Sequence, residues 1–549
     1  MSKKRFRNGM VVATGALMTV GAIGMSGLAN TAQASAQQPL VMGVGPLGSF
    51  QDNFNPYSSS AVPDTSGLVY QALFYFNGVA SNVYPLLGVK DSWTNHNRTL
   101  TVDLRHGVKW TDNTPFTSAD VVFTFDMLKK YPALDTTGVW AQLASVKASG
   151  KYAVRFTFKA ANVPFSFYVL TVPIVPQHIW KKYSNPVTAT NPTPVGTGPY
   201  VFQKFSSSQV TESANPNYWG GKPPVQTLEF PAFDSNTSAD LAMVKGQVDW
   251  GGWFIPNIQT DFINKNSKLN HYWFPLVATT TLYPNLKDPL LSQLPVREAI
   301  SMGIDRTKLD QLGEYGFNPP AGPTSLVLPT YSSWKDKSLP AKDFQPVAYN
   351  PKGAIAVLKK AGYKMNSSGI FVSPSGKPLS FTLDVVSGWT DWDSDCSLIE
   401  QELKQIGIQI KVQEMQYGAY YSAVHGGTYQ LAISWQSTGG FSPYYAYQGM
   451  LNPQGGWDIE QWSNPATTKA LNDYSKTTNR KVQQKAIDVL EETMVKQLPT
   501  IPLMYATDFQ EYTTKNFTGF PDASNPYAFG QPGSGAAAAE ILLHLKPVH

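Results

Sequence analysis

Tryptophan side chains are the residues in this sequence best suited to binding chemistry. They occur in two closely spaced pairs, Trp250 with Trp253 and Trp389 with Trp392, and Asp391 lies inside the second pair. A sugar ring presents a face of C–H groups surrounded by hydroxyls, so a flat indole with nearby Asp, Asn or Gln side chains suits it. These pairs therefore predict contacts with an oligosaccharide, and packing in a hydrophobic core is the alternative for each tryptophan.

A second candidate region runs from residue 415 to residue 457. It contains no Asp, Glu, Lys or Arg, and ten of its 43 residues are aromatic. Its hydroxyl and backbone groups can hydrogen-bond to a neutral partner but cannot offset a charge. We expect a core role for about half of the aromatics. The residues that we expect to contact an uncharged ligand are Trp435, Ser437, Thr438, Gly439, Tyr444 and Tyr445.

Acidic residues at positions 391, 393, 395 and 402 have the spacing of a calcium loop. However, Cys396 occupies the position at which such a loop requires glycine. Acids at the start of a helix interact favourably with the helix dipole. The sequence therefore predicts a helix start here and no metal site.

Catalytic patterns are sparse. The seven histidines are scattered, and neither a His-Glu-x-x-His nor a Gly-x-Ser-x-Gly motif occurs. Cys396 is expected to be a small buried residue. Carboxylates from distant segments could still form a glycosidase pair.

Asn285 is a candidate for a hydroxyl contact with a ligand. A role in a turn after Pro284 explains it equally well.

Composition narrows the class of protein. The chain has 549 residues, of which 42% are hydrophobic and 15% are charged, so it can build large cores and more than one lobe is expected. Four of the bases in the net charge of +5 lie in the first seven residues, which leaves 39 bases against 38 acids. No nucleic-acid partner is therefore expected. The single cysteine excludes an internal disulfide framework.

The first 36 residues have the features of a secretory signal peptide. A basic start is followed by an uncharged apolar run over 10–28 and by Ala34-Ser35-Ala36, a small-x-small cleavage site. No cysteine lies near this site, so attachment of lipid through a lipobox cysteine is not expected. We expect an exported protein in the periplasm or at the cell surface, and a membrane anchor is the alternative for this segment.

The hydrophobic pattern predicts helices that alternate with strands. Residues 99–104 alternate apolar and polar side chains, as a strand does, and a helical stretch starts at Ser118. Residues 351–360 and 397–405 have helical spacing, and a strand is expected from Ile408. This order indicates an α/β protein with mixed sheets.

Several short motifs occur in order across nearly the whole chain after residue 36. They are LRHGVKWTDNTP at 104–115 with SADVV at 118–122, VGTGPY at 195–200, NPNYW at 215–219, VREAI at 296–300 with Asp305-Arg306, and IPL at 501–503. The ordered set resembles the solute-binding proteins of oligopeptide and dipeptide ABC importers, solute-binding family 5. Asn113 stands where the family usually has Gly, and Asn tolerates the left-handed conformation of such a turn.

The resemblance implies a two-lobed α/β fold of the periplasmic-binding-protein type, with mixed sheets and an extra inserted domain. Lobe I is expected to comprise residues 37–78, 175–282 and 508–549. The inserted domain is expected at 79–174, and lobe II at 283–507. No cofactor is expected, and the resemblance implies that a separate ATPase supplies the energy. The sequence contains no motif that resembles a nucleotide-binding loop, which agrees with that division.

The implied function is capture of a small-molecule ligand between two closing lobes and its delivery to a membrane permease, by a monomer that is not an enzyme. Peptide-binding relatives hold the ligand's ammonium with an Asp in the loop that matches 435–443, which has no acid here. A buried ammonium without a counter-charge costs several kcal/mol. The Trp pairs also look like those of the family's cello-oligosaccharide-binding branch. We predict an oligosaccharide ligand; an oligopeptide is the alternative, and a secreted glycoside hydrolase is a remote one.

Overall fold

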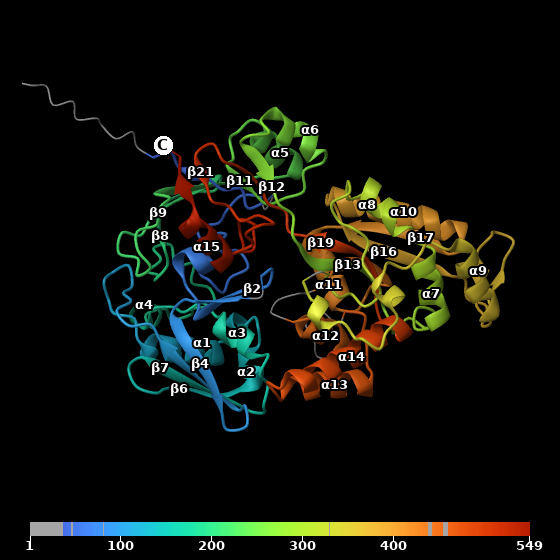
Figure 1. Cartoon of the computed structure of the whole chain (residues 1–549), viewed down its shortest axis with the longest axis horizontal. Helices are drawn as coiled ribbons and strands as arrows, with labels where there is room; N and C mark the ends of the chain where they lie inside the picture. The colour runs from blue at the N-terminus through green and yellow to red at the C-terminus, as the bar shows by residue number, and fades with distance from the viewer. Residues whose placement is uncertain are drawn as a thin grey trace, which may run out of the picture. The chain divides into compact units, whose positions relative to one another are not determined.

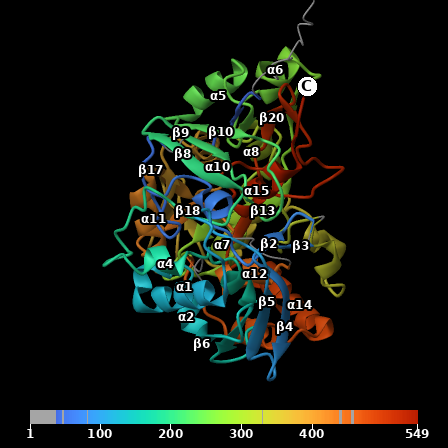
Figure 2. The ribbon, with the colours of Figure 1, turned by 90° about the vertical axis from the view of Figure 1, so that its left-hand side faces the viewer.

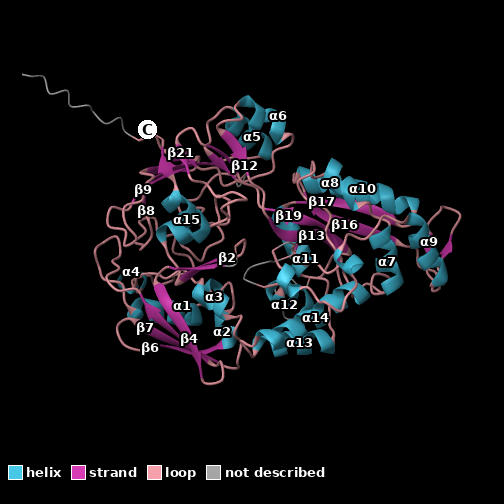
Figure 3. Cartoon of the chain, viewed as in Figure 1, coloured by secondary structure: helices cyan, strands magenta, loops and turns pink. Residues whose placement is uncertain are grey.

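The computed structural model describes residues 37–548 except 46–47, 81, 329, 437–441 and 454–458. The expected signal peptide, residues 1–36, lies outside the described residues. The chain divides after Gln37, and the unit Gln38–His549 carries the elements given below. Helices and strands both occur throughout this unit, as Figure 3 shows.

The first sheet joins the two ends of the chain. Its strands have the order β1 (Leu40–Val41), β10 (Thr227–Pro231), β9 (Gln209–Ala214) and β8 (Tyr200–Ser206). β1 is parallel to β10, and the other pairs are antiparallel. Leu228 and Phe230 share a core with Ile541 and Leu542 of helix α15 (Ala536–His544). The last helix is therefore part of the same core as the first strand.

A three-stranded sheet stands beside a small core. Its order is β11 (Trp250–Gly251), β20 (Glu511–Thr513) and β12 (Asn270–Tyr272). The neighbouring elements are α5 (Asn236–Val244), α6 (Ile258–Asp261) and the 3-10 turn η3 (Ile263–Lys265). Ala239 and Met243 of α5 pack with Ile258 in this core.

A second four-stranded sheet is entirely antiparallel. Its order is β4 (Gly88–Thr94), β5 (Thr99–Leu104), β7 (Ala153–Phe158) and β6 (Leu143–Ala148). The strand predicted at 99–104 is confirmed, because Leu100, Val102 and Leu104 are buried on one face while Asp103 is exposed.

Helix α1 (Ser118–Lys130) packs on this sheet and lies close to it in Figure 2. Thr117 and Asp120 start the helix with a capping box, which satisfies two backbone donors. Asn113 has a φ of 69°, as expected for the residue that replaces the family's glycine. The short elements of the same part of the chain are η1 (Thr65–Val69), β2 (Phe74–Asn77), β3 (Asn82–Pro85), η2 (Pro132–Leu134), α2 (Val139–Gln142), α3 (Ser166–Leu170) and α4 (Gln177–Trp180).

The largest sheet is mixed and separates two cores. Its order is β17 (Gln409–Met415), β16 (Ser380–Val386), β18 (Leu431–Trp435), β13 (Leu276–Pro284) and β19 (Ile501–Thr507). β16 is parallel to both of its neighbours, whereas β13 is antiparallel to β18 and β19. Successive side chains point to opposite faces, so Leu282 enters one core and Tyr283 enters the other.

Helices cover both faces of this sheet. Figure 1 shows α8 and α10 on one side of it and α11 and α12 on the other. The helix predicted at 351–360 is confirmed, and the one predicted at 397–405 begins earlier, at Thr390. The helices are α7 (Leu294–Met302), α8 (Arg306–Leu312), α9 (Pro351–Lys360), α10 (Thr390–Gln405), α11 (Tyr417–His425), α12 (Tyr444–Leu451), α13 (Pro465–Ser475) and α14 (Arg480–Gln497).

Short peripheral elements complete the fold. They are η4 (Ser332–Trp334), η5 (Ala341–Phe344), β14 (Lys364–Met365), β15 (Phe371–Val372), β21 (Phe517–Thr518) and β22 (Lys546–Pro547). Within the described residues, no helix is both long and apolar enough to span a membrane. Cys396 is a buried free thiol in the core on one side of the mixed sheet, as expected.

Candidate functional site

Two cavities share part of their walls. Tyr75, Phe76, Phe167 and Ser534 line both of them. The first cavity has a volume of about 330 Å³, and its other lining residues include Leu276, Val327, Tyr331 and Phe529. The second has a volume of about 310 Å³, and its other lining residues include Ser66, Tyr70, Thr171 and Gly535. Each volume falls at the lower end of the range of small-molecule sites, roughly 300–1,000 Å³.

Five segments of the chain build these walls. β2 supplies Phe76, whose ring lies edge-on to Phe167 of α3, with centroids 5.2 Å apart. Leu276 opens β13, and Tyr331 precedes the 3-10 turn η4. Ser534 lies in the loop that leads into α15. The site therefore depends on tertiary packing between parts of the chain that are hundreds of residues apart.

The lining of both cavities carries no formal charge. None of the described residues that line them is Asp, Glu, Lys, Arg or His. The polar groups are hydroxyls and backbone groups: burial raises the pKa of Tyr331 to about 12, so its phenol stays neutral. The hydroxyl of Tyr75 accepts a hydrogen bond from the backbone N–H of Phe529 at 3.2 Å. Such a lining can hydrogen-bond hydroxyls and amides but cannot neutralise an ion.

Tyr444 and Tyr445 lie at the start of α12, outside the walls of the two cavities. Both are buried, and neither lines a described cavity. The hydroxyl of Tyr445 donates to the carbonyl oxygen of Pro164 at 3.1 Å, and its ring lies 5.3 Å from that of Phe167. Tyr444 stacks on Tyr474, with centroids 4.3 Å apart. Tyr445 therefore supports a cavity residue, and its direct contact with a ligand stays a prediction.

Trp389, Trp392 and Trp435 form one aromatic cluster. Their ring centroids are 5.2 Å apart for Trp389 and Trp392, 5.0 Å for Trp389 and Trp435, and 4.7 Å for Trp392 and Trp435. β16 and β18 are parallel neighbours, so their carboxyl ends lie at one edge of the sheet, where α10 begins. Trp392 is buried, Trp389 is half-buried and Trp435 is 40% exposed. The cluster thus presents indole surface to solvent.

Asp391 lies in the first turn of α10, beside this cluster. Burial raises its pKa to about 6, and the charge of Asp393 adds to that effect. The backbone N–H of Gly388 donates to Asp393 at 3.1 Å, as is typical of a carboxylate at a helix start. The helix prediction for these acids is thus confirmed. In the described part of the chain, no three His, Cys, Asp or Glu side chains are grouped to hold a metal ion.

Trp250 and Trp253 lie in a different part of the fold, in and beside the three-stranded sheet. Trp250 is 0% exposed, and its indole N–H donates to the carbonyl oxygen of Gly530 at 2.9 Å. Trp253 is buried, and its indole N–H donates to Asp240 at 2.8 Å. In this structure both rings are surrounded by protein, and neither lines a described cavity. Direct contact of Trp250 or Trp253 with a ligand stays a prediction, and the burial of both rings does not favour it.

The remaining predicted residues divide into two groups. The side-chain NH₂ of Asn285 donates to the backbone carbonyls of Gly427 and Tyr429, and its oxygen accepts from the backbone N–H of Lys287. These contacts fit the turn interpretation of Asn285. Ser437, Thr438 and Gly439 lie outside the described residues.

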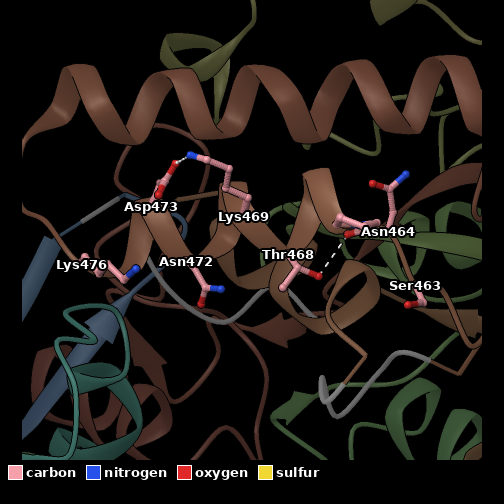
Figure 4. A pocket seen from close by; sticks show the side chains of 8 residues that line it. Ser463, Asn464, Thr468, Lys469, Asn472, Asp473 and Lys476 are labelled. Carbon is pink, nitrogen blue, oxygen red and sulfur yellow. Dashed lines mark hydrogen bonds and ion pairs between the residues drawn. The ribbon is translucent and has the colours of Figure 1, made fainter.

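A third hollow runs along α13 and has a different character. Its volume is about 510 Å³, and Figure 4 shows its polar and charged side chains. Lys469 pairs with Asp473 at 2.5 Å, and the hydroxyl of Thr468 donates to the carbonyl oxygen of Asn464 at 3.1 Å. These residues belong to one helix and the loop before it, so the hollow is a surface groove. The two charge-free cavities are the stronger candidate for a ligand site.

The sequence did not identify Phe76, Phe167, Tyr331 or Ser534 as site residues. A partial signal was present, because Phe74, Tyr75 and Phe76 form an aromatic run in one short strand. That run alone cannot indicate which distant segments face it.

Comparison with known proteins identifies the family. Residues 82–458 match the bacterial extracellular solute-binding proteins, family 5. The oligopeptide-binding protein AppA of Bacillus subtilis is 24% identical over 419 residues, which cover 74% of this chain and 75% of AppA. The glutathione-binding protein GsiB of Salmonella paratyphi A is 26% identical over 449 residues, 77% of this chain and 80% of GsiB.

Solved structures agree. A periplasmic oligopeptide-binding protein of an ABC transporter from Thermotoga maritima superposes with a TM-score of 0.87 and 26% identity, over 94% of this chain and 100% of that one. A second crystal structure from Thermotoga maritima, with mannohexaose bound, gives 0.82 and 27% over 94% and 99%. The chain therefore belongs to the family 5 extracellular solute-binding proteins, the two-lobed α/β binding proteins of ABC importers.

Proposed function

We propose that this protein captures a neutral oligosaccharide in the two adjoining cavities and delivers it to an ABC permease. The observation that carries the proposal is the charge-free, aromatic lining of both cavities. Aromatic faces pack against the C–H face of a sugar, while hydroxyls such as those of Tyr331 and Ser534 can bond its OH groups. The crystal structure of the Thermotoga maritima relative with mannohexaose bound supports this ligand class.

An oligopeptide is the second candidate, because several relatives are named as peptide-binding proteins. A free peptide carries an ammonium and a carboxylate, and a buried charge needs a partner of opposite sign. The described lining of the two cavities offers no such partner. Among the described residues, the absence of a charged partner therefore favours an oligosaccharide over a peptide.

The two lobes would close on the ligand. We propose lobe I at 37–78, 175–282 and 508–549, an inserted domain at 79–174, and lobe II at 283–507. The first cavity draws Phe76, Leu276 and Phe529 from the segments of lobe I, and Val327 and Tyr331 from lobe II. A ligand that contacts both groups favours the closed state by its differential affinity.

We further propose export of the chain after cleavage near residue 36, without a lipobox anchor, and action as a monomer that is not an enzyme. The sequence of the first 36 residues and the binding-protein relatives support this assignment. Hydrolysis of a labelled oligosaccharide by purified protein would contradict it.

Calorimetry with mannohexaose tests the proposal at the level of residues. Phe167→Ala removes a ring that lines both cavities, so we expect affinity to fall by about 1–3 kcal/mol. Phe165→Ala is the matched control, because Phe165 precedes the same helix and lines neither cavity. Equal effects of the two variants, or no effect of Phe167→Ala, would show that the ligand binds elsewhere.

A further inference from the structure

The carboxylate of Asp64 holds one wall of the two cavities. Its Oδ1 accepts a hydrogen bond from the backbone N–H of Gly535 at 2.7 Å, and its Oδ2 accepts one from Gly533 at 2.9 Å. Between these glycines lies Ser534, which lines both cavities. The donors are 469 and 471 residues away along the chain, so the two bonds join its beginning to its end.

The backbone is shaped for this contact on both sides. Asp64 has a φ of 59°, in the left-handed region that few residues other than glycine adopt, and Gly533 and Gly535 have φ values of 86° and 62°. A Cβ placed on Gly67 would lie 2.2 Å from the carbonyl carbon of Gly535. The segment that follows Asp64 therefore touches the turn directly, with no room for a side chain between them.

We propose that Asp64 is a positioning residue for ligand binding, whose carboxylate fixes the turn 533–535 so that Ser534 and the start of α15 form the cavity wall. This inference rests on the proposed function, because it takes the two cavities as the ligand site. An ionised carboxylate offers an acceptor to each of the two N–H groups. A protonated carboxyl retains one good acceptor, and its O–H then needs an acceptor of its own.

The surroundings of Asp64 make its ionisation sensitive to pH. Burial raises its pKa to about 7, against the two backbone hydrogen bonds, which lower it. Glu212 on β9 is buried nearby, and its pKa is raised to about 8 by burial first and by the charge of Asp64 second. On α15 the titratable groups are Glu540 and His544, which pair with each other at 3.5 Å. Among the described residues, Asp64 has no ion-pair partner, so no cation stabilises its carboxylate.

Ligand affinity and folding stability should respond to this group with opposite signs. The pKa of Asp64 in the folded protein lies above its ordinary value of 3.8, so between these values the folded state binds more protons than the unfolded state. The contribution of Asp64 to stability therefore falls as the pH rises from about 4 to about 7. The turn, in contrast, is fixed best by the carboxylate, so affinity should rise as the pH passes through about 7. A purely structural role would not separate the two trends.

Calorimetry with mannohexaose from pH 6 to pH 8.5 tests the proposal. For the natural chain we expect affinity to rise several-fold across this range. For Asp64→Asn we expect affinity about tenfold weaker at pH 8 and flat with pH, since the amide oxygen replaces only one of two charge-assisted acceptors. Glu491→Gln is the matched control: Glu491 is a buried acid with its pKa raised to about 8, it accepts a backbone N–H from Asp336 at 2.8 Å, and it lines neither cavity.

A second readout needs no ligand. Hydrogen exchange at the amides of Gly533 and Gly535, compared at one pH of 8, should be about tenfold faster in Asp64→Asn than in Glu491→Gln. If mannohexaose fails to bind the natural chain, the proposed ligand class is wrong, and the exchange rates still decide whether Asp64 fixes the turn. Equal exchange in the two variants, or an unchanged pH profile of affinity in Asp64→Asn, would overturn the inference.

Discussion

The two Trp-x-x-Trp segments have the same pattern in the sequence, but their side chains differ in burial in the fold. Trp250 lies in a two-residue strand, and both Trp250 and Trp253 are buried with their indole N–H groups bonded to the protein. Trp389 and Trp392 lie at the start of α10, where they meet Trp435 at the exposed edge of the mixed sheet. The spacing of tryptophans therefore does not decide whether a group of them is fully buried or keeps an exposed ring.

Topology decides it. β11 pairs with β20, so Trp250 is placed between the three-stranded sheet and the core that contains α15. A helix start at the carboxyl end of parallel strands is instead an edge, where side chains keep an open face. We therefore expect Trp250 and Trp253 to contribute to stability, and the cluster of Trp389, Trp392 and Trp435 to offer a surface for binding. The following substitutions and conditions test that division.

The largest effect is expected from Trp250→Ala. Removal of a fully buried indole should lower the free energy of unfolding by about 3–5 kcal/mol, because the lost contacts leave a cavity. Chemical denaturation measures this change. Trp435→Ala is the comparison variant, and its cost should be below about 1.5 kcal/mol because the ring is partly exposed. A stable Trp250→Ala protein that has lost ligand affinity would reverse the assignment.

A smaller effect is expected on binding from the exposed cluster. Trp435 lines neither of the two cavities, so its contact with the ligand rests on the sequence pattern alone. That pattern predicts a loss of mannohexaose affinity of about 1–3 kcal/mol for Trp435→Ala. Tyr421→Ala serves as a control, since Tyr421 is an exposed aromatic residue on α11 outside the cluster. Calorimetry that gives the same affinity for both variants and the natural chain would remove the cluster from the binding surface.

A still smaller effect, on stability, is expected from Asp240, the acid that bonds to Trp253. Asp240 accepts the indole N–H of Trp253, and burial raises its pKa to about 6. Since this value exceeds the ordinary 3.8, stability should fall as the pH rises from about 4 to about 6, and Asp240→Asn should flatten that fall. The difference should stay below about 1 kcal/mol because the group is partly solvated. Thermal denaturation at pH 4 and pH 7 measures it, and an unchanged fall would contradict the assignment.

The smallest change is expected with salt. The described cavity lining has no charge, so mannohexaose affinity should vary less than about twofold between low and high ionic strength. Calorimetry at two salt concentrations checks this. A steep loss of affinity with salt would indicate an ion pair with the ligand.

Much of the fold was predictable because local patterns carried it. The strand at 99–104 and the helix at 351–360 follow from hydrophobic spacing, and the family follows from its ordered motifs. The acids before Cys396 start a helix, as the dipole argument predicts.

The site was predictable only in part. The sequence indicated Trp389 and Trp392 as a pair and Trp435 separately, but the contact of Trp435 with that pair arises from the parallel pairing of β16 with β18. Phe76 and Phe167 meet through tertiary packing, which no local spacing encodes. The burial of Trp250 depends on a strand too short to show a periodic pattern.

The most direct test of the central claim is calorimetry of the natural protein with mannohexaose, with free-amine peptides and with N-acetylated versions of the same peptides. A charge-free site predicts measurable binding of mannohexaose and weak binding of the free-amine peptides, which acetylation does not reduce. Tight peptide binding that is lost on acetylation would reveal an amine-holding site, and the oligosaccharide assignment would then be wrong.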